Sequence, residues 1–263
     1  MICKARLQKC FSQAQPYYDQ QALVQQKIVE KLTALLAQQR THFAHCLEIG
    51  CGTGRLTQAL AQNVAIQHWD LNDLCDQHAL LKQLLPSQTV HFMQGDAEQL
   101  QPTRQYDLIA SASTVQWFDN KAQFIARCAQ WLQPEGLLLL STFCPENLRE
   151  IKQLTGAGLD YPELAQWQSW LAQDFDILHL SRETMLLEFD SPQAVLQHLK
   201  QTGVTATHQQ IWTKSKLQQF YQNYQKNYRT SAGKVRLTYT PILLLAQRKS
   251  TQRTEQRNEQ WDK

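Results

Sequence analysis

The sequence predicts an α/β fold built on a doubly wound, mostly parallel sheet. Strand and helix patterns alternate along the first half of the chain, which is the order that defines this class. A glycine-rich turn at 50–54 joins a strand pattern to a helix pattern, an arrangement that lets a ligand approach bare backbone. The four leucines at 137–140 suit a strand that is buried on both faces of a parallel sheet.

Two segments precede the glycine turn. Between Asp19 and Gln39 apolar residues recur near the helical period of 3.6, so we expect a helix there, with Asp19 able to cap its start. The aromatic-rich stretch 11–19 has no clear period and can fold over a cofactor pocket. We therefore assign residues 1–40 to an N-terminal lid and helix.

The glycine turn favours a cationic cofactor. Gly50, Gly52 and Gly54 follow a G-x-G-x-G spacing, not the G-x-G-x-x-G of dinucleotide folds. Glu48, just before them, would repel a pyrophosphate. S-adenosyl-L-methionine carries a sulfonium and an ammonium group and no phosphate, so it fits better. Glycine-rich turns occur in many α/β folds, and this turn alone does not decide the matter.

Acidic residues follow the next two predicted strands. Residues 64–69 predict a second strand ending at Asp70, where a doubly wound fold places a carboxylate for ribose hydroxyls. A third strand at 89–93 leads to Asp96, and a fourth begins at 106. The glycine turn, Asp70 and Asp96, in this order, resemble the class I S-adenosylmethionine-dependent methyltransferases.

That resemblance implies a Rossmann-like seven-stranded sheet, mostly parallel, with an antiparallel last strand. It implies that Asp70 holds the ribose, that Asp96 holds the adenine amino group, and that Glu48 contacts the cofactor ammonium or shapes the loop. The full set of cofactor-binding candidates is Glu48, Gly50, Gly52, Gly54, Asp70, Leu71, Asp96, Ala97 and Ser111.

The remaining elements define the expected domain organisation. Helices are expected at 74–84, 122–132, 192–200 and 215–228, and a pair of strands at 175–189. We expect an S-adenosylmethionine-binding core over 41–190 and a helical substrate-side insertion over 191–234. The last core strand is expected at 235–247, and residues 248–263 form a polar tail that we expect to be disordered.

Composition excludes several classes of protein. The 263 residues are 43% hydrophobic, enough for one large α/β domain, and no stretch approaches the roughly 20 apolar residues of a membrane span. No signal-peptide pattern follows the N-terminal basic residues. Seven cysteines without a C-x-x-C pair predict free thiols in a reducing cytoplasm. Histidine spacing gives no metal motif, and we expect no metal.

Charge is unevenly distributed along the chain. The net charge of +3 combines a balance of +9 over residues 200–263 with one of −6 over residues 1–199. A concentrated basic surface suits an anionic partner, and a solvated tail is the alternative. Even without the tail, seven cations remain in the folded part: Lys200, Lys214, Lys216, Lys226, Arg229, Lys234 and Arg236.

The end of the fourth strand, where this fold brings substrate to cofactor, has no general base. Residues 111–118 contain no His or Lys, and no Asn/Asp-Pro-Pro-aromatic element of the kind used to methylate base amino groups. A carboxylate is already ionised at pH 7 and needs no deprotonation. Catalysis would then depend on alignment and on the removal of water.

Longer segments resemble one family. Residues 111–118, 140–148 and 95–98, the N-terminal Phe11…Tyr18-Asp19, and Leu199-Lys200-x-x-Gly203 are similar to the malonyl-acyl-carrier-protein O-methyltransferases of biotin synthesis. The similarity covers most of residues 4–247. It implies methylation of the free carboxyl of a malonyl thioester, which then primes pimeloyl chain synthesis. The implied partner, an acyl carrier protein, is acidic and suits the basic region. Cys144 and Ala112 depart from the family's usual glycine and asparagine.

The resemblance also suggests substrate-side residues. Tyr18 is the candidate to close over the cofactor and substrate, or it is a core-packing aromatic. Trp117, with Phe118, is expected to line the acyl channel. A malonyl carboxylate calls for a cationic anchor, for which Lys200 is the first candidate, then Arg229 and Arg149. Each of these cations has the alternative of a plain surface charge.

Other functions stay open at this point. A methyltransferase of a small free carboxylic acid would share the fold and the chemistry. An RNA methyltransferase would use the basic region for phosphates, although no RNA-binding module is recognisable and a nucleic-acid partner is disfavoured. A non-catalytic S-adenosylmethionine-binding regulator would keep the same cofactor motifs. Methyl turnover on a defined acceptor separates these readings.

Overall fold

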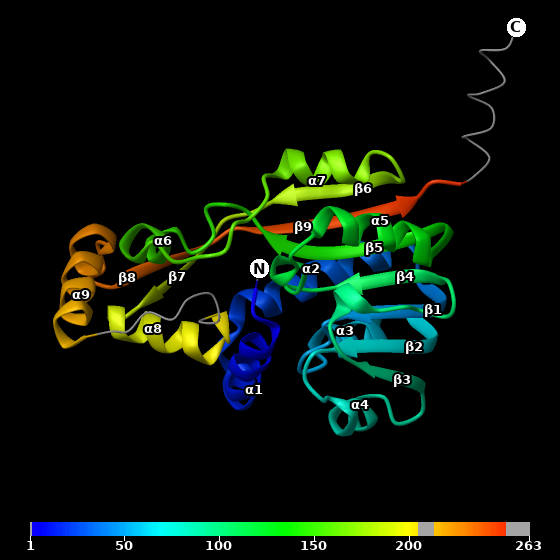
Figure 1. Ribbon diagram of the computed structural model, residues 1–263, viewed down its shortest axis with the longest axis horizontal. Coiled ribbons are helices and arrows are strands. Elements are labelled where there is room, and N and C mark those ends of the chain that lie inside the picture. The colour runs from blue at the N-terminus through cyan, green and yellow to red at the C-terminus, as the bar shows by residue number, and fades with distance from the viewer. Residues whose placement is uncertain (1, 205–212, 251–263) are drawn as a thin grey trace, which may run out of the picture.

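A computed structural model of the chain describes residues 2–204 and 213–250. Its main feature is a seven-stranded sheet of order β3-β2-β1-β4-β5-β9-β6 (Figure 1). Strands β1 to β5 are parallel, and β9 runs antiparallel to both β5 and β6. The strands are β1 His42–Ile49, β2 Ala65–Asp73, β3 Thr89–Gln94, β4 Tyr106–Ser111, β5 Leu132–Phe143, β6 Phe175–Arg182 and β9 Pro241–Arg248. This confirms the expected mostly parallel sheet with an antiparallel last strand.

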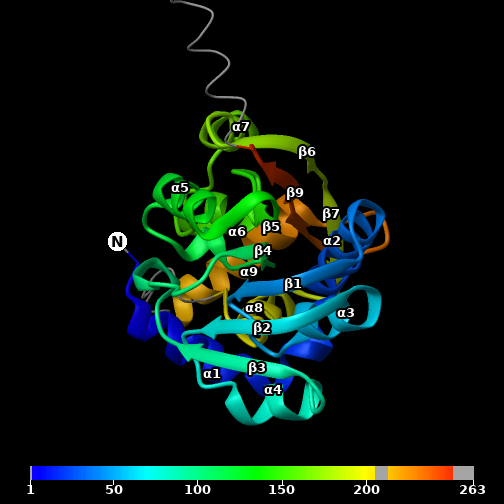
Figure 2. The same cartoon turned by 90° about the vertical axis from the view of Figure 1, so that its right-hand side faces the viewer.

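Helices cover both faces of the sheet. Figure 2 shows α2 (Leu23–Gln39) and α3 (Arg55–Asn63) on one side and α5 (Lys121–Trp131) on the other. Alternate leucines of β5 explain why both faces need cover, since Leu137 and Leu139 pack into one core cluster and Leu138 and Leu140 into the other. The remaining core helices are α4 (His78–Leu84) and α7 (Leu164–Leu171).

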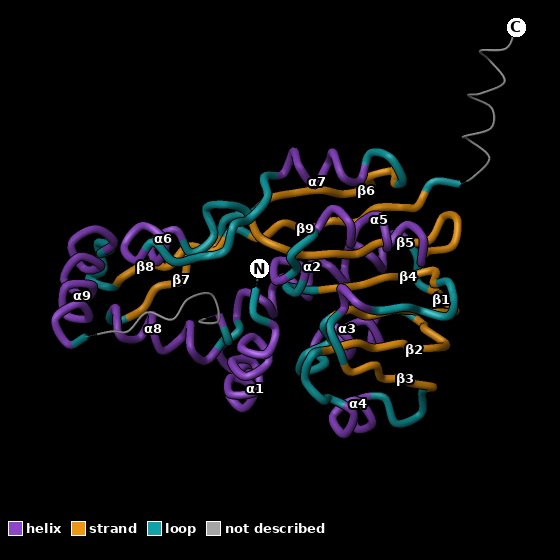
Figure 3. Tube along the Cα trace, viewed as in Figure 1, coloured by secondary structure: helices purple, strands orange, loops and turns teal. Residues whose placement is uncertain are grey.

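A second, two-stranded sheet lies at one end of the molecule. Strands β7 (Met185–Phe189) and β8 (Val235–Tyr239) pair antiparallel, and α6 (Arg149–Thr155), α8 (Pro192–Gln201) and α9 (Lys214–Tyr228) surround them (Figure 3). Helices α8 and α9 account for the helices expected in 191–234. Of the expected tail, residues 251–263 lie outside the described part of the chain, and the sheet itself extends to Arg248.

The final strand is not continuous over 235–247, as the sequence suggested, but is divided at Thr240. The backbone N–H of Thr238 donates to Glu150 at 3.0 Å, and that of Thr240 donates to Asn147 at 3.1 Å. Pro241 has no N–H to offer a ladder. The chain leaves the small sheet after Tyr239, at Thr240, whose N–H is taken by Asn147, and it enters the main sheet as β9 from Pro241.

The N-terminal segment also differs from expectation. Residues 11–19 are helical and belong to α1 (Lys4–Gln21), which ends just before α2 begins at Leu23. Asp19 therefore does not cap the second helix. Its carboxylate accepts a hydrogen bond from the Thr53 hydroxyl at 2.7 Å and pairs with Arg55 at 3.1 Å. Figure 1 shows α1 between α8 and the carboxyl ends of the parallel strands, a position from which it covers the site described next.

Candidate functional site

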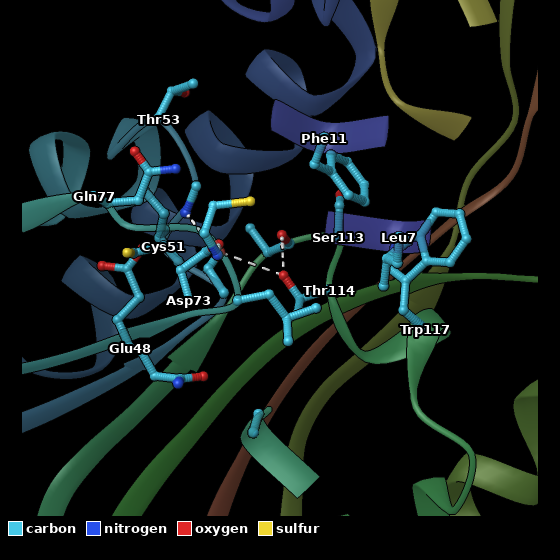
Figure 4. A pocket seen from close by; sticks show the side chains of 18 of the residues that line it. Leu7, Phe11, Glu48, Cys51, Thr53, Asp73, Gln77, Ser113, Thr114 and Trp117 are labelled. Carbon is cyan, nitrogen blue, oxygen red and sulfur yellow. Dashed lines mark hydrogen bonds between the residues drawn. The ribbon is translucent and has the colours of Figure 1, made fainter. Parts of the chain in front are cut away.

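The principal cavity opens at the carboxyl ends of β1 to β4. It encloses about 1100 Å³, including its open mouth. The side facing the sheet is formed by the glycine turn and by the residues that end β2, β3 and β4. The opposite side is formed by α1, through Leu7 and Phe11 (Figure 4), and Tyr18 of the same helix also lines the cavity. This first cavity lies where open α/β sheets bind their ligands.

The glycine turn is fixed by close contacts. Gly50 has φ +69°, and a Cβ added there would lie 2.2 Å from the Thr114 hydroxyl oxygen. Gly54 has φ +75° and precedes α3, and a Cβ there would meet Leu84 at 2.2 Å. Side chains are thus excluded at both positions. Gly50 and Gly52 line the first cavity, whereas Gly54 does not and serves the turn itself.

The carboxylate at the end of β2 is Asp73, not Asp70. The second strand continues three residues past Asp70, and Asp70 is buried outside the cavity. The Tyr106 hydroxyl donates to it at 2.7 Å, and Arg104 lies 3.6 Å away. Leu71 is likewise a core residue that does not line the cavity. The cavity is therefore not lined by the residue for which the sequence predicted a ribose contact.

Asp73 has the position that the sequence assigned to Asp70. It lines the first cavity beside the glycine turn (Figure 4). One carboxylate oxygen accepts from the Gly52 N–H at 2.9 Å and the other from the Cys75 N–H at 2.8 Å. A carboxylate can accept about four hydrogen bonds, so Asp73 can accept further ones from a ligand. The signal that could have found it is the second acid of Asp70-Leu-Asn-Asp73 at the true end of the strand.

Glu48 is a buried carboxyl with one side-chain partner. It is 1% exposed, and the Thr57 hydroxyl donates to it at 2.8 Å. Burial raises the pKa of Glu48 to about 8, against the lowering effect of the Thr57 bond. No ion pair with a Lys, Arg or His is found for Glu48 within the described ranges 2–204 and 213–250. A cationic group entering the cavity would favour the ionised form of this carboxyl and pair with it.

Asp96 and Ala97 line the same cavity after β3. Asp96 accepts from the Glu98 N–H at 3.1 Å, and the Lys4 ammonium lies 3.6 Å from it. Lys4 also donates to the Glu98 carboxylate at 2.6 Å. The start of α1 is thus tied to the loop after β3, a contact that the sequence did not reveal because these residues are far apart in the chain.

A second cavity adjoins the first. It encloses about 350 Å³, part of it open to solvent, and shares five lining residues with the first cavity: Phe11, Tyr18, Gln25, Ser113 and Trp117. Phe11 and Trp117 meet edge to face, with ring centroids 5.7 Å apart. Tyr18 and Trp117 thus lie on the wall between the cavities, which is where the sequence-based candidates for substrate contact were expected to be.

Tyr18 is a neutral group at this wall. Burial raises the pKa of Tyr18 to about 12, and the nearby Asp19 carboxylate adds to the effect. Its phenol therefore stays protonated at neutral pH and can donate a hydrogen bond, but it does not act as a base.

The other predicted site residues lie elsewhere. Ser111 is buried and donates to the Ile49 carbonyl at 2.8 Å, so it supports the β1–β4 edge without lining either cavity. Lys200 is exposed on α8. Neither it nor Arg149 or Arg229 lines either cavity, so among the described residues the structure does not bring a predicted cationic anchor to the site.

The described residues contain neither a metal-binding cluster nor a membrane-crossing helix. Within 2–204 and 213–250, no group of three or more His, Cys, Asp and Glu side chains is placed to hold a metal ion. In the same ranges no helix has the length and apolar character to cross a membrane. All seven cysteines are free thiols.

Comparisons with known proteins agree with this geometry. A family described as "Methyltransferase domain" matches residues 47–140. Malonyl-[acyl-carrier protein] O-methyltransferase of Haemophilus ducreyi is 46% identical over 95% of this chain and 98% of its own length. The protein of the same name from Haemophilus influenzae is 44% identical over 93% and 95%, and that from Porphyromonas gingivalis is 45% identical over 90% and 93%.

Solved structures support the fold. A Bacillus halodurans protein described as a putative methyltransferase has a TM-score of 0.61 at 18% identity, covering 84% of this chain and 99% of that one. The N-methyltransferase NodS of Bradyrhizobium japonicum, solved with S-adenosyl-L-homocysteine, has a TM-score of 0.52 at 11% identity over 84% and 86%. With the sequence identities above, which extend over nearly the whole chain, this protein belongs to the family of malonyl-[acyl-carrier protein] O-methyltransferases.

Proposed function

We propose that this protein transfers the methyl group of S-adenosyl-L-methionine to the free carboxyl of malonyl-acyl carrier protein. The product, a malonyl methyl ester, would prime pimeloyl chain synthesis for biotin. The observation that carries the proposal is 44–46% identity to proteins of that name over more than nine-tenths of the chain. The two adjoining cavities, one suited to the cofactor and one to an acceptor, support it.

The first cavity fits the cofactor group by group. Asp73 would accept hydrogen bonds from the ribose hydroxyls, and Asp96 with the backbone at Ala97 would contact the adenine. Glu48 would face the ammonium end, where the positive charge would favour ionisation of its buried carboxyl. Tyr18 would close the methionine end from α1. Bound there, S-adenosyl-L-methionine supplies an electrophilic methyl group on a positively charged sulfur.

The chain's own contribution is alignment and exclusion of water. The wall formed by Phe11, Tyr18 and Trp117 separates cofactor from acceptor, so an acceptor oxygen must approach along it. A new oxygen–carbon bond forms as the carbon–sulfur bond breaks, and the carboxylate and sulfonium charges are both neutralised. No proton moves, which is consistent with a site whose Tyr18 stays protonated.

The carrier protein and the compartment belong to the same proposal. The relatives' name specifies an acyl carrier protein, and exposed lysines on α8 and α9 (Lys200, Lys214, Lys216 and Lys226) offer it a basic surface. Seven free thiols fit a reducing compartment such as the cytoplasm.

Labelled methyl transfer tests the proposal directly. Malonyl-acyl carrier protein, acetyl-acyl carrier protein, malonyl-coenzyme A and free malonate are each incubated with the enzyme and labelled S-adenosyl-L-methionine. Label on the malonyl carrier and not on the acetyl carrier supports the proposal. Label on free malonate alone would make this a small-acid methyltransferase, and absence of label with all four would exclude the proposed reaction.

A further inference from the structure

Tyr161 lines the second cavity, and no hydrogen-bond acceptor for its hydroxyl proton is found among the described residues. Asn147 is 3% exposed, and its Oδ1 accepts the Thr240 backbone N–H at 3.1 Å. A backbone N–H can only donate, so this bond fixes which way the amide of Asn147 faces. Its Nδ2 then donates to the Tyr161 hydroxyl oxygen at 3.0 Å. Tyr161 accepts from Asn147 and keeps its own proton to donate to another group.

Ser113, on the wall shared by the two cavities, has a second such hydroxyl. Its Oγ is buried and has no hydrogen-bond partner. Its backbone is held at φ +56°, a conformation that costs a non-glycine residue energy and concentrates at functional sites. The Ser113 N–H donates to the Ser141 hydroxyl oxygen at 2.9 Å, which helps to hold this conformation.

Charge on the walls of the second cavity is absent in the part of the chain that the structure describes. The residues that line it include no Lys, Arg, Asp or Glu. The segment 205–212, which follows its lining residue Val204, contains no lysine or arginine in its sequence. Among the described residues, the charged donor usually expected for a carboxylate is thus missing from this cavity, while neutral donors that include the Tyr161 and Ser113 hydroxyls are present.

We propose that the free carboxylate of the malonyl group is bound in the second cavity by neutral donors, the Tyr161 and Ser113 hydroxyls, without a lysine or arginine. This rests on the proposed function. Ser113 lies at the boundary with the first cavity, where the attacking oxygen must be, and Tyr161 lies on the wall of the second cavity alone.

Neutral donors suit the chemistry of this reaction. The negative charge of the carboxylate disappears as the ester forms, so a cation paired with it would stabilise the ground state more than the transition state. Hydroxyl donors orient the carboxylate and offset part of the cost of its desolvation. Their interaction with it weakens less than that of a cation when its charge disappears. Burial raises the pKa of Tyr161 to about 12, which keeps its proton in place throughout the neutral range.

Two conservative variants of the full chain test the assignment. In Tyr161→Phe and Ser113→Ala, kcat/KM for a short malonyl thioester without phosphates should fall about tenfold to a hundredfold, the effect of losing one hydrogen bond to a charged group. In both variants the unfolding temperature should stay close to wild type, and in Tyr161→Phe so should the calorimetric affinity for S-adenosyl-L-homocysteine, because Tyr161 lines the second cavity alone. Tyr17→Phe is the matched control, because Tyr17 is 51% exposed and lines neither cavity.

The cationic alternative is tested in parallel with Lys200→Met and Arg149→Met. The short thioester needs no carrier docking, so a cation that matters for it must touch the malonyl group. Wild-type kcat/KM in folded Tyr161→Phe or Ser113→Ala overturns the proposal, as does a loss in either cation variant that exceeds those in the hydroxyl variants. A wild-type enzyme that methylates no malonyl thioester would instead refute the proposed function, so the two failures are distinguishable.

Discussion

Glu48 shows how one buried carboxyl couples cofactor binding to pH. With its pKa raised to about 8, it holds a proton at pH 7 in the cofactor-free protein, whereas the unfolded chain does not. Stability of the free protein should therefore fall as pH rises from about 4.5 to 8, because over that range the native state binds the extra proton. The ammonium group of a bound cofactor would favour the ionised form of Glu48 and offset the free-energy cost of ionising it in a buried site.

The substitution Glu48→Gln should separate the effect of this carboxyl on stability from its effect on cofactor binding. The amide oxygen can still accept from Thr57, and the cost of ionising a buried carboxyl disappears. We expect an unfolding temperature a few degrees above wild type at pH 8 and equal to it at pH 5, measured by calorimetry without cofactor. Affinity for S-adenosyl-L-methionine should fall at least tenfold. A variant less stable than wild type at pH 8 would contradict this account.

Two aspartates on one strand give the clearest test of the cofactor assignment. Asp73→Asn should weaken S-adenosyl-L-homocysteine binding at least tenfold, because an amide offers ribose hydroxyls fewer acceptor sites. Asp70→Asn should leave this affinity within about twofold of wild type, since Asp70 contacts Tyr106 outside the cavity. Titration calorimetry with S-adenosyl-L-homocysteine on both variants decides which aspartate binds the cofactor. The reverse order of effects would restore Asp70 as the ribose residue.

At the scale of elements, α1 has few buried apolar residues. Only Leu7 and Ala14 of its 18 residues are buried, compared with seven of 17 in α2. Two hydrogen bonds help to hold α1 in place: the Gln8 side chain donates to the Leu74 carbonyl at 2.7 Å, and Lys4 donates to the Glu98 carboxylate at 2.6 Å. Segments with few buried apolar contacts open at low free energy and supply the lids of binding sites.

Hydrogen exchange should therefore distinguish the two N-terminal helices. Without cofactor, amides of α1 should exchange well before those of α2, and S-adenosyl-L-homocysteine should slow α1 specifically. Mass spectrometry of peptic peptides measures both, and α2 serves as the internal control. Equal protection of the helices in the free protein, or no change on binding, would show that α1 is a fixed wall of the cavity.

Elements with strong local patterns were predictable, and those set by distant partners were not. The glycine turn and the leucines of β5 carry their own signals, and the structure has both where expected. The end of β2 was misplaced because a charged residue rarely lies inside a buried strand. Asp70 does so because distant residues satisfy its carboxylate: Tyr106, 36 residues later, donates to it, and Arg104 lies 3.6 Å away. The division at Thr240 likewise depends on Asn147 and Glu150.

At the scale of the whole molecule, exposed lysines gather on α9. Helix α9, with exposed Lys214, Lys216 and Lys226, lies at one end of the long axis beside the small sheet, and α4 lies beside β3 at the edge of the main sheet (Figure 1). None of these three lysines forms an ion pair within the described ranges 2–204 and 213–250. Such a surface steers an acidic partner without contributing to the chemical step.

Reversing charge on α9 should therefore affect the carrier-linked substrate alone. In the double variant Lys216→Glu and Lys226→Glu, KM for malonyl-acyl carrier protein should rise about three- to tenfold at low salt, with kcat unchanged. The difference should shrink toward 0.5 M salt, where exposed charges are screened within about 4 Å. The exposed Lys82 of α4 supplies the control variant Lys82→Glu. For a short malonyl thioester all three proteins should have the same KM, and a rise there would mean that α9 acts on the active site and not on carrier docking.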